Sequence, residues 1–494
     1  MLKKITATLL LLCLGLSFFA GCGGTSDDIA TVTEKQTADT TAIDEEAGLS
    51  ELDKRRRIPD ELPEIKFAGR EFRVACEEAK SYEILSEELI GEVTNDVIYD
   101  RNVEICERFD SAIKNVVVTN AHDHVVTTVL AGDDAYDIIG YKAYLVYKSV
   151  QAKVVTNFYD LPYINLEKPW YNQITNDAAT FYGKLFAATC SLGISAMQYT
   201  YAMFANQRLV EAHGYPVTDI YGMVYDNEWV YDKFLEIVST VYTDVNGDGK
   251  KDIDDVYGYM TGNTHPLDAW LPAFDQNITS RDSNDEIVIN VMSEKTVQAL
   301  EKIYDLTYNN PSAYYSPAEY KEFDQFAYGK VAIAPMPFKV CYDKIRDMDD
   351  NYAVLPYPKW DENQEMFLTN IYDQYSVFSI PKTVYGDDAY EFVGVMLEGL
   401  NAVSYKDVYP AYYDIALKDK YTTDADSAAM VDIVMEGSNM DFSFMFGETD
   451  MQRIPYIFRD CINGKKLDIA SEYANKETAL ATSIPKIYEY YKEG

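Results

Sequence analysis

The stretch Gly132-Asp133-Asp134-Ala135-Tyr136-Asp137-Ile138-Ile139 decides the fold class, because it closes a regular alternation of strands and helices. It combines a polar turn with a short apolar strand over residues 136–139. Upstream, residues 72–76 alternate apolar and polar side chains, and this pattern predicts another strand. A further strand is predicted over residues 112–118. Three strands are thus expected within this part of the chain.

Two helices are predicted between these strands. Asn95 and Asp96 are expected to cap a helix whose apolar residues, from Val97 to Phe109, recur at helical spacing. A second helix is predicted over residues 123–130. The order strand–helix–strand–helix–strand favours a parallel sheet with right-handed crossovers. The sequence therefore predicts an α/β protein.

The N-terminus has the parts of a secretory signal peptide over residues 1–21. A basic start is followed by an apolar run from Leu9 to Phe19, which is too short to span a membrane. Cys22 comes directly after Ala20-Gly21, and this arrangement resembles the lipobox of bacterial lipoproteins, whose cysteine is lipidated. The alternative is an ordinary signal peptide with an incidental cysteine. We expect a body held at the outer face of the cell membrane, on its extracellular or periplasmic side, by lipid on Cys22.

Residues 22–60 are predicted to be this lipidated N-terminus followed by a flexible tether. The segment is rich in Thr, Asp and Glu and poor in bulky apolar residues, so it buries little surface on ordering. The basic run Lys54-Arg55-Arg56-Arg57 could contact lipid headgroups. With Glu51 and Asp53 beside it, a short solvated helical turn is the favoured interpretation.

The 494-residue chain carries a formal net charge of −38. This charge argues against nucleic acid or an anionic membrane surface as a partner, because phosphate binding needs clustered lysine and arginine. The length suits two lobes better than a single core. The five cysteines that follow Cys22 lack a CxxC pair, which favours buried thiols over a disulfide framework or a zinc site.

The loop from Asp244 to Asp255 has the spacing of a calcium-binding loop. Calcium prefers six to eight oxygen ligands, which a 12-residue loop with acidic or amide side chains at positions 1, 3, 5 and 12 can supply. The ligands predicted here are Asp244, Asn246, Asp248, the backbone carbonyl of Lys250, and Asp255, with Asp252 contributing through water. A bound Ca²⁺ would be structural, and the alternative is a polar turn that binds no metal.

Several segments resemble the bacterial extracellular solute-binding proteins of family 1. They begin with the turn and strand at residues 132–139 and extend in the family's order over residues 60–494. The other segments are Leu166-Glu167-Lys168-Pro169-Trp170-Tyr171, Gly183-Lys184-Leu185, Asn206 with its following helix, residues 227–234 leading through the calcium-like loop to Tyr257-Gly258, Phe326-Ala327-Tyr328-Gly329-Lys330-Val331-Ala332, Val354-Leu355-Pro356-Tyr357-Pro358-Lys359 and Tyr409-Pro410-Ala411-Tyr412-Tyr413.

The resemblance implies a two-lobe fold like that of type II periplasmic binding proteins, with a hinge and a ligand in the interlobe cleft. By analogy, residues 61–205 and about 375–404 form the first lobe. Residues 206–374 and about 405–494 form the second, which contains the calcium-like loop. Residues 198–206 are expected to leave the first lobe as a strand, and the hinge is expected near residues 205 and 375.

The resemblance also implies a monomeric carrier that captures a sugar or oligosaccharide and delivers it to a membrane permease of the ABC type. Related lobes bind peptides or polyamines, and these ligands stay open. Sugar recognition needs flat apolar faces beside planar carboxylates and amides. The ligand-binding residues predicted on this basis are Tyr141, Trp270, Asp275, Tyr372, Asp373 and Gln374, whereas Trp170 and Trp229 are interpreted as packing residues.

An enzymatic role is not favoured. The sequence has no GxSxG, HExxH or P-loop motif, and its four histidines form no recognisable catalytic set. A secreted carbohydrate-active hydrolase needs only two opposed carboxylates, and 81 acidic residues leave that alternative open. The order of the family segments favours binding without chemistry.

Overall fold

The computed structural model describes residues 49–418 and 425–493. The predicted signal peptide and Cys22 lie outside the described residues. Residues 50–494 group together as one unit. Within the described part of the chain, no helix has both the length and the apolar character needed to cross a bilayer.

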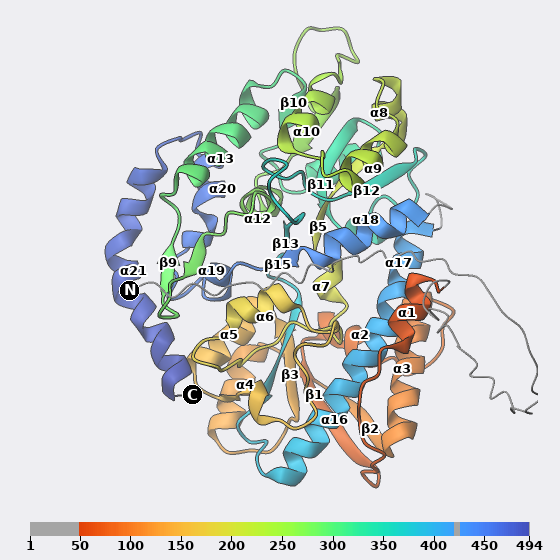
Figure 1. The fold of residues 1–494 in the computed structure, drawn as a ribbon, viewed down its shortest axis with the longest axis vertical. Helices are drawn as coiled ribbons and strands as arrows, with labels where there is room; N and C mark the ends of the chain where they lie inside the picture. The colour runs from red at the N-terminus through yellow and green to blue at the C-terminus, as the bar shows by residue number, and fades with distance from the viewer. Residues whose placement is uncertain (1–48, 419–424, 494) are drawn as a thin grey trace, which may run out of the picture. The chain divides into compact units, whose positions relative to one another are not determined.

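The first of two main sheets lies in the lower half of Figure 1 and has the strand order β2-β1-β3-β14-β4. β1 pairs in parallel with β2 and with β3, which confirms the parallel sheet predicted from the sequence. β14 comes from far along the chain and pairs antiparallel with β3 and β4. The bounds are β1 Arg70–Cys76, β2 Ser111–Val117, β3 Ile138–Lys142, β4 Val155–Thr156 and β14 Ser376–Pro381.

The predicted start of the first long helix is wrong by several residues. α3 spans Val93–Phe109, and the Glu92 carboxylate caps it by accepting the backbone N–H groups of Thr94 and Asn95. Asp96 instead accepts the backbone N–H groups of the loop that leads into the helix. A glutamate is not a preferred N-cap residue, so the usual capping pattern pointed to the wrong position.

The second sheet lies in the upper half of Figure 1 and has the order β10-β7-β11-β5-β12, with β6 beside β7. β5 belongs to this sheet, so the strand predicted to leave the first lobe already lies in the second sheet. The strands of the second sheet are β5 Tyr201–Asn206, β6 Tyr242–Thr243, β7 Val256–Thr261, β10 Ala313–Tyr315, β11 Val331–Pro337 and β12 Tyr352–Leu355.

Helices pack against both sheets. Around the first sheet these are α2 Ser81–Ile84, α3, α4 Ala121–Leu130, α5 Ala143–Gln151, α6 Gln173–Ala179 and α16 Asp387–Val403. Around the second they are α8 Gln207–Ala212, α9 Val217–Tyr225, α10 Tyr231–Ser239, α12 Trp270–Ala273, α13 Glu294–Tyr304, α14 Lys321–Ala327, α15 Lys339–Asp343 and α18 Ala425–Glu436.

Three segments of the described chain connect the two sheets. The first passes from α7 (Ser195–Gln198) into β5, and the second runs from residue 371 into β14. These two segments pair antiparallel at Thr200 and Ile371. The third is a continuous helical run in which α16 passes through a π-helical turn, η4 (Ser404–Val408), into α17 (Tyr409–Lys418).

The C-terminal part of the chain reaches elements of both sheets. α20 (Ile457–Asn463) packs against α13, and α21 (Ile469–Glu493) packs against α20 and also against α5. Near the end of α21, Tyr491 lies 5.2 Å from Phe181 and 5.3 Å from Phe186 between ring centroids. The segment 405–494, expected in the second lobe, therefore also contacts the first sheet's helices.

Residues 50–60, predicted as the end of the tether, are docked on the body, whereas the tether predicted before residue 49 lies outside the described residues. α1 (Glu51–Arg57) is a helix that packs against η4, and Asp60 forms an ion pair with Arg108 of α3. The helical turn expected at the basic run is present, but Arg55 is largely buried rather than solvated. The docked body therefore begins about ten residues earlier than the composition indicated, because long-range side-chain partners order this polar segment.

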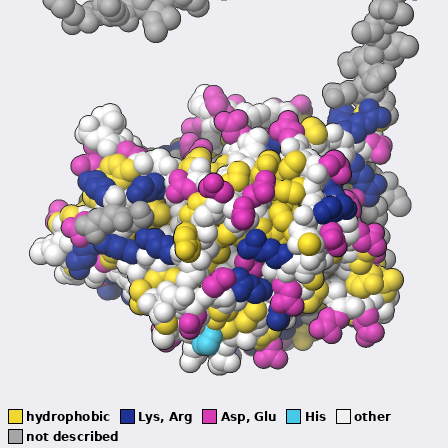
Figure 2. Space-filling view, turned by 90° about the horizontal axis from the view of Figure 1, so that it is seen from below, with side chains coloured by type: hydrophobic (Ala, Val, Ile, Leu, Met, Phe, Trp, Pro, Cys, Tyr) yellow, Lys and Arg dark blue, Asp and Glu magenta, His cyan; other side chains and the backbone are white. Residues whose placement is uncertain are grey.

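Acidic side chains are spread over the face of the molecule that is seen from below. Figure 2 shows them across the face below the first sheet, interspersed with hydrophobic and basic side chains. On this face, therefore, the acidic side chains do not gather into one patch.

Candidate functional site

The candidate site lies between the two sheets, where their strands end. β7 ends at Thr261 and leads into a short helix, α11 (His265–Asp268). Residues 372–374 lie two residues before the start of β14 in the first sheet. α20 packs against α11 and completes the site. Ligands of open α/β sheets bind at the carboxyl ends of strands, so this is the expected location for a ligand.

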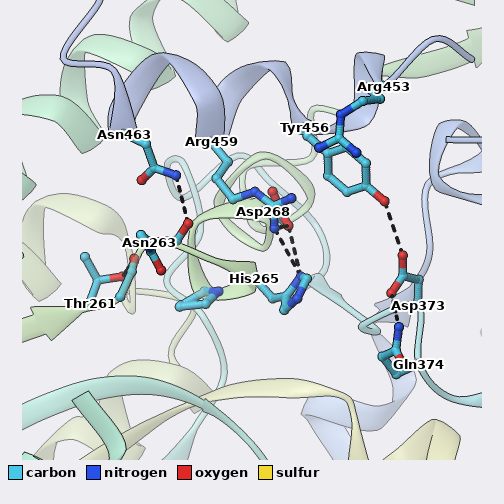
Figure 3. A network of polar contacts seen from close by, with 12 residues as sticks. Thr261, Asn263, His265, Asp268, Asp373, Gln374, Arg453, Tyr456, Arg459 and Asn463 are labelled. Atoms are coloured by element: carbon cyan, nitrogen blue, oxygen red, sulfur yellow. Dashed lines mark hydrogen bonds and ion pairs between the residues drawn. The ribbon is translucent and has the colours of Figure 1, made fainter. Parts of the chain in front are cut away.

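The side chains that gather here are called the interlobe cluster: Asn263, His265, Asp268, Tyr372, Asp373, Gln374, Tyr456, Arg459 and Asn463. Figure 3 labels all of them except Tyr372. Arg459 donates to Asp268 at 2.8 Å and lies 3.2 Å from Nδ1 of His265. Tyr456 donates to Asp373 at 3.3 Å. The cluster thus joins α11, α20 and the second crossing segment through buried or half-buried polar groups.

An aromatic strip runs from the cluster towards the first sheet. The rings of His265 and Tyr372 are stacked, with centroids 3.4 Å apart at 25°. Tyr372 meets Tyr199 edge to face at 5.7 Å, and the ammonium group of Lys80 lies 4.6 Å from the Tyr199 ring centroid. Lys80 follows β1, so this strip extends from one sheet to the other. Flat aromatic faces beside hydrogen-bonding groups are the usual elements of a sugar site.

Several buried polar atoms beside α11 have no hydrogen-bond partner among the described residues. They are Oδ1 of Asn263, Oγ1 of Thr264 and Oδ1 of Asp268. The buried carboxyl of Glu322 beside them faces the backbone N–H groups of Gly262 and of Glu322 itself and has no side-chain partner. A buried polar atom without a partner is costly, and in native proteins such atoms commonly bind a ligand or water. Their concentration after β7 marks this edge as a place where polar ligand groups can bind.

Burial shifts the ionisation of two carboxyls in this region. Burial raises the pKa of Glu322 to about 8. A Cβ on Gly262 would lie 2.6 Å from both carboxyl oxygens of Glu322, so a larger residue there would force this buried carboxyl to move. Burial also raises the pKa of Asp373, although the nearby His265 partly offsets this effect. At neutral pH, Glu322 therefore carries its proton and can both donate and accept a hydrogen bond.

The structure brings together three of the six predicted ligand residues. Tyr372, Asp373 and Gln374 are all members of the interlobe cluster. Tyr141 and Trp270 are instead fully buried: the Tyr141 hydroxyl bonds that of Ser149, and the Trp270 indole donates to the hydroxyl of Tyr259.

Neither the Tyr141 nor the Trp270 ring offers a free face to a ligand. Asp275 is exposed at the end of α12, with a positive φ of 52°. The packing roles predicted for Trp170 and Trp229 are confirmed, since both are 0% exposed.

In the predicted calcium loop the acidic side chains bond backbone N–H groups of the loop, and among the described residues they do not converge on a common point. Asp244 accepts the backbone N–H groups of Gly247 and Gly249, and Asp248 accepts that of Lys250. The Asp255 carboxylate accepts the backbone N–H of Val245. In the described part of the chain, no three Asp, Glu, His or Cys side chains lie close enough together to hold a metal ion. The calcium assignment therefore stays a prediction.

A separate pocket of about 510 Å³ lies beyond the far end of β14. Tyrosines and carboxylates from residues 159–163 and from the start of α16 line it. None of the predicted site residues contributes to this pocket.

Comparison with solved structures identifies the architecture. A cyclo/maltodextrin-binding protein complexed with maltotetraose is 14% identical, with a TM-score of 0.54 over 86% of this chain and 98% of that one. The chain has the fold of the periplasmic binding proteins. UspC of M. tuberculosis is 16% identical, with a TM-score of 0.54 over 83% of this chain and 99% of that chain.

A third similar structure is the maltose/maltodextrin-binding domain of Bdellovibrio bacteriovorus bound to maltotriose. It is 12% identical, with a TM-score of 0.50 over 85% of this chain and 100% of that chain. No protein-family model and no curated protein matches the sequence. At these identities the similarity establishes the fold.

The sequence did not indicate His265, Asp268, Tyr456 or Arg459 as site residues. His265 and Asp268 follow β7 at its carboxyl end, so the argument that selected Tyr141 after β3 could have found them. Tyr456 and Arg459 lie near the C-terminus and approach α11 only through the packing of α20. No local pattern in the sequence predicts that contact.

Glu322 gives a test of the buried polar edge. Its pKa is about 8 in the folded protein and about 4.5 when unfolded, so the folded state retains a proton that the unfolded chain releases between these values. The contribution of Glu322 to the free energy of unfolding is therefore fully present below about pH 4.5. It is lost as the pH rises towards 8, at up to about 1.4 kcal/mol per pH unit. Glu322→Gln should remove that part of the pH dependence.

The measurement is urea unfolding of both proteins at pH 5 and pH 8. The free energy of unfolding of Glu322→Gln minus that of the parent should therefore be larger at pH 8 than at pH 5. Glu319→Gln, on the exposed loop before α14, is the control and should follow the parent at both values. Equal pH dependence in Glu322→Gln and the parent would contradict a buried protonated carboxyl.

Proposed function

We propose that this chain is an extracellular solute-binding protein that captures a sugar or oligosaccharide between its two lobes without altering it. It delivers this solute to the membrane permease of an ABC-type importer. The lobes correspond to the two main sheets with their helices, and the crossing segments at Thr200 and Ile371 act as the hinge.

The observation that carries the proposal is the chemistry of the unpartnered atoms beside the interlobe cluster. Oδ1 of Asn263 and Oδ1 of Asp268 need donors, whereas the Thr264 hydroxyl and the protonated Glu322 carboxyl can donate and accept. A sugar hydroxyl also does both. An ammonium group only donates and a carboxylate only accepts, so polyamines and acidic solutes satisfy this set less completely.

Two further features support a sugar. Tyr372 and Tyr199 supply aromatic faces next to the polar edge, which suits the apolar C–H patches of a pyranose ring. Two proteins with the same fold are described in complex with maltotetraose and maltotriose.

A hydrolase is less well supported. Its two candidate carboxylates in the cluster are already engaged, Asp268 by Arg459 and Asp373 by Tyr456.

A ligand screen tests the proposal directly. Calorimetry with monosaccharides, malto-oligosaccharides, polyamines and short peptides should detect binding in the sugar arm. Tyr372→Ala should weaken that binding by about 1–3 kcal/mol, because a buried aromatic contact is lost. Tyr328→Ala, which removes a tyrosine that is 69% exposed, is the matched control and should bind like the parent.

The other outcomes are informative. Binding confined to peptides or polyamines would keep the transport role and reject the sugar. Shortened oligosaccharides in the sample would reject the carrier role in favour of hydrolysis.

We also propose that the loop from Asp244 to Asp255 binds one structural Ca²⁺. A bound ion at 100 times its dissociation constant adds about 2.7 kcal/mol to stability. The chelator EGTA should therefore lower the melting temperature by several degrees, and Asp248→Ala should abolish that sensitivity. Asp282→Ala, in an acidic turn between the short strands β8 (Thr279–Arg281) and β9 (Ile287–Ile289), should retain it. Identical melting curves in EGTA and in calcium would reject the site.

The membrane attachment is the third part of the proposal. Cys22 is expected to be the lipidated mature N-terminus, which anchors the protein at the outer face of the cell membrane. Cys22→Ala should release the protein into the medium or leave it unprocessed. Mass spectrometry of the membrane-extracted protein should find diacylglycerol on Cys22, and an unmodified N-terminus at another residue would contradict the assignment.

A further inference from the structure

The basic run at residues 54–57 is not used by the proposed binding site, yet one of its arginines is largely buried. The side chain of Arg55 is 15% exposed and forms an ion pair with Asp432 at 3.1 Å. Its guanidinium also lies 4.5 Å from the ring centroid of Tyr405 and 5.8 Å from that of Tyr413. Next to it, Arg56 pairs with Asp407 at 2.8 Å.

The partners of Arg55 belong to elements that pack on different sheets. Tyr405 lies on η4, which packs against α3 and α16 beside the first sheet. Asp432 lies on α18, which packs against β12 of the second sheet. Tyr413 lies on α17, the helix that continues η4 towards the second lobe. A single guanidinium therefore contacts the third crossing, at η4 and α17, and also α18 of the second lobe. Figure 1 shows α1 beside α17 at this junction.

We propose that α1 is a clasp across the third crossing, in which Arg55 holds η4 and α18 together and restrains the opening of the two lobes. This inference rests on the proposed function, because a binding protein must open to admit and release its solute. When the lobes separate, α18 moves relative to η4, and Arg55 cannot keep both contacts. Release of the clasp then accompanies opening.

The chemistry of the contact suits a reversible restraint. Arginine combines a planar ion pair with stacking on aromatic rings, and each interaction is of modest strength at a partly exposed site. The Asp432 side chain is 44% exposed, so water can replace its bond to Arg55 when the clasp opens. A fully buried apolar contact would hold the lobes more permanently.

Hydrogen–deuterium exchange of the full mature chain, without ligand, tests the clasp. The reporter is the hinge pair, in which the backbone N–H of Tyr372 bonds the carbonyl of Tyr199 at 3.0 Å. Arg55→Ala should speed exchange in peptides covering residues 199–201 and 371–375 about threefold or more. Asp432→Asn is the milder variant if the first does not fold. Arg57→Ala, an exposed arginine on the same helix, should exchange like the parent.

The double variant that combines Arg55→Ala with Asp432→Asn should exchange like the stronger of the two single variants, because both changes break the same contact. Faster exchange limited to α1 and α18, with the hinge peptides unchanged, would overturn the proposal. An equal effect of Arg57→Ala would overturn it as well, since loss of positive charge alone would then suffice. Because no ligand is used, these outcomes are independent of the sugar screen.

Discussion

Two crossing segments pair with each other at Thr200 and Ile371, and the position of the candidate site depends on this pairing. The backbone N–H of Tyr372 donates to the carbonyl of Tyr199, so their rings meet between the two sheets. The next two residues, Asp373 and Gln374, then enter the interlobe cluster before β14 begins. Without this register, the aromatic strip and the polar groups would have no common location.

Buried charge reinforces the same junction from the first-sheet side. Glu83 is 0% exposed and accepts hydrogen bonds from the backbone N–H and hydroxyl of Ser195 and from the hydroxyl of Ser376. Ser195 precedes one crossing segment and Ser376 follows the other. Lys80 lies 3.5 Å from the same carboxylate. A buried carboxylate is tolerated only with such partners, so breaking this set would destabilise both crossings together.

The two ends of the described chain connect the lobes with different chemistry. α1 makes an ion pair and cation–π contacts at a partly exposed site. At the end of α21, in contrast, the Tyr491 ring packs against the rings of Phe181 and Phe186. Apolar contacts of this kind are strong and are not screened by salt, whereas exposed ion pairs are weak and screened by it. The polar connection at α1 is therefore the more easily released of the two.

The sequence by itself determined the α/β class, the parallel order of β1, β2 and β3, and the packing of Trp170 and Trp229. These features follow from local periodicity and from the large apolar surface of tryptophan, which a chain of this size buries. The tertiary structure decided the rest of the site. Tyr141 and Trp270 are residue types that commonly contact sugars, but both are buried here. Their burial depends on neighbours far along the chain, which local sequence does not reveal.

Arg459 and Tyr456 reach the cluster only through the packing of α20 on α11, and Arg55 is buried only because α1 packs on η4. Local sequence encodes the spacing of side chains along an element. Contacts between elements separated by hundreds of residues depend on the complete packing. For that reason the sequence predicted the class of fold but only three of the nine residues of the interlobe cluster.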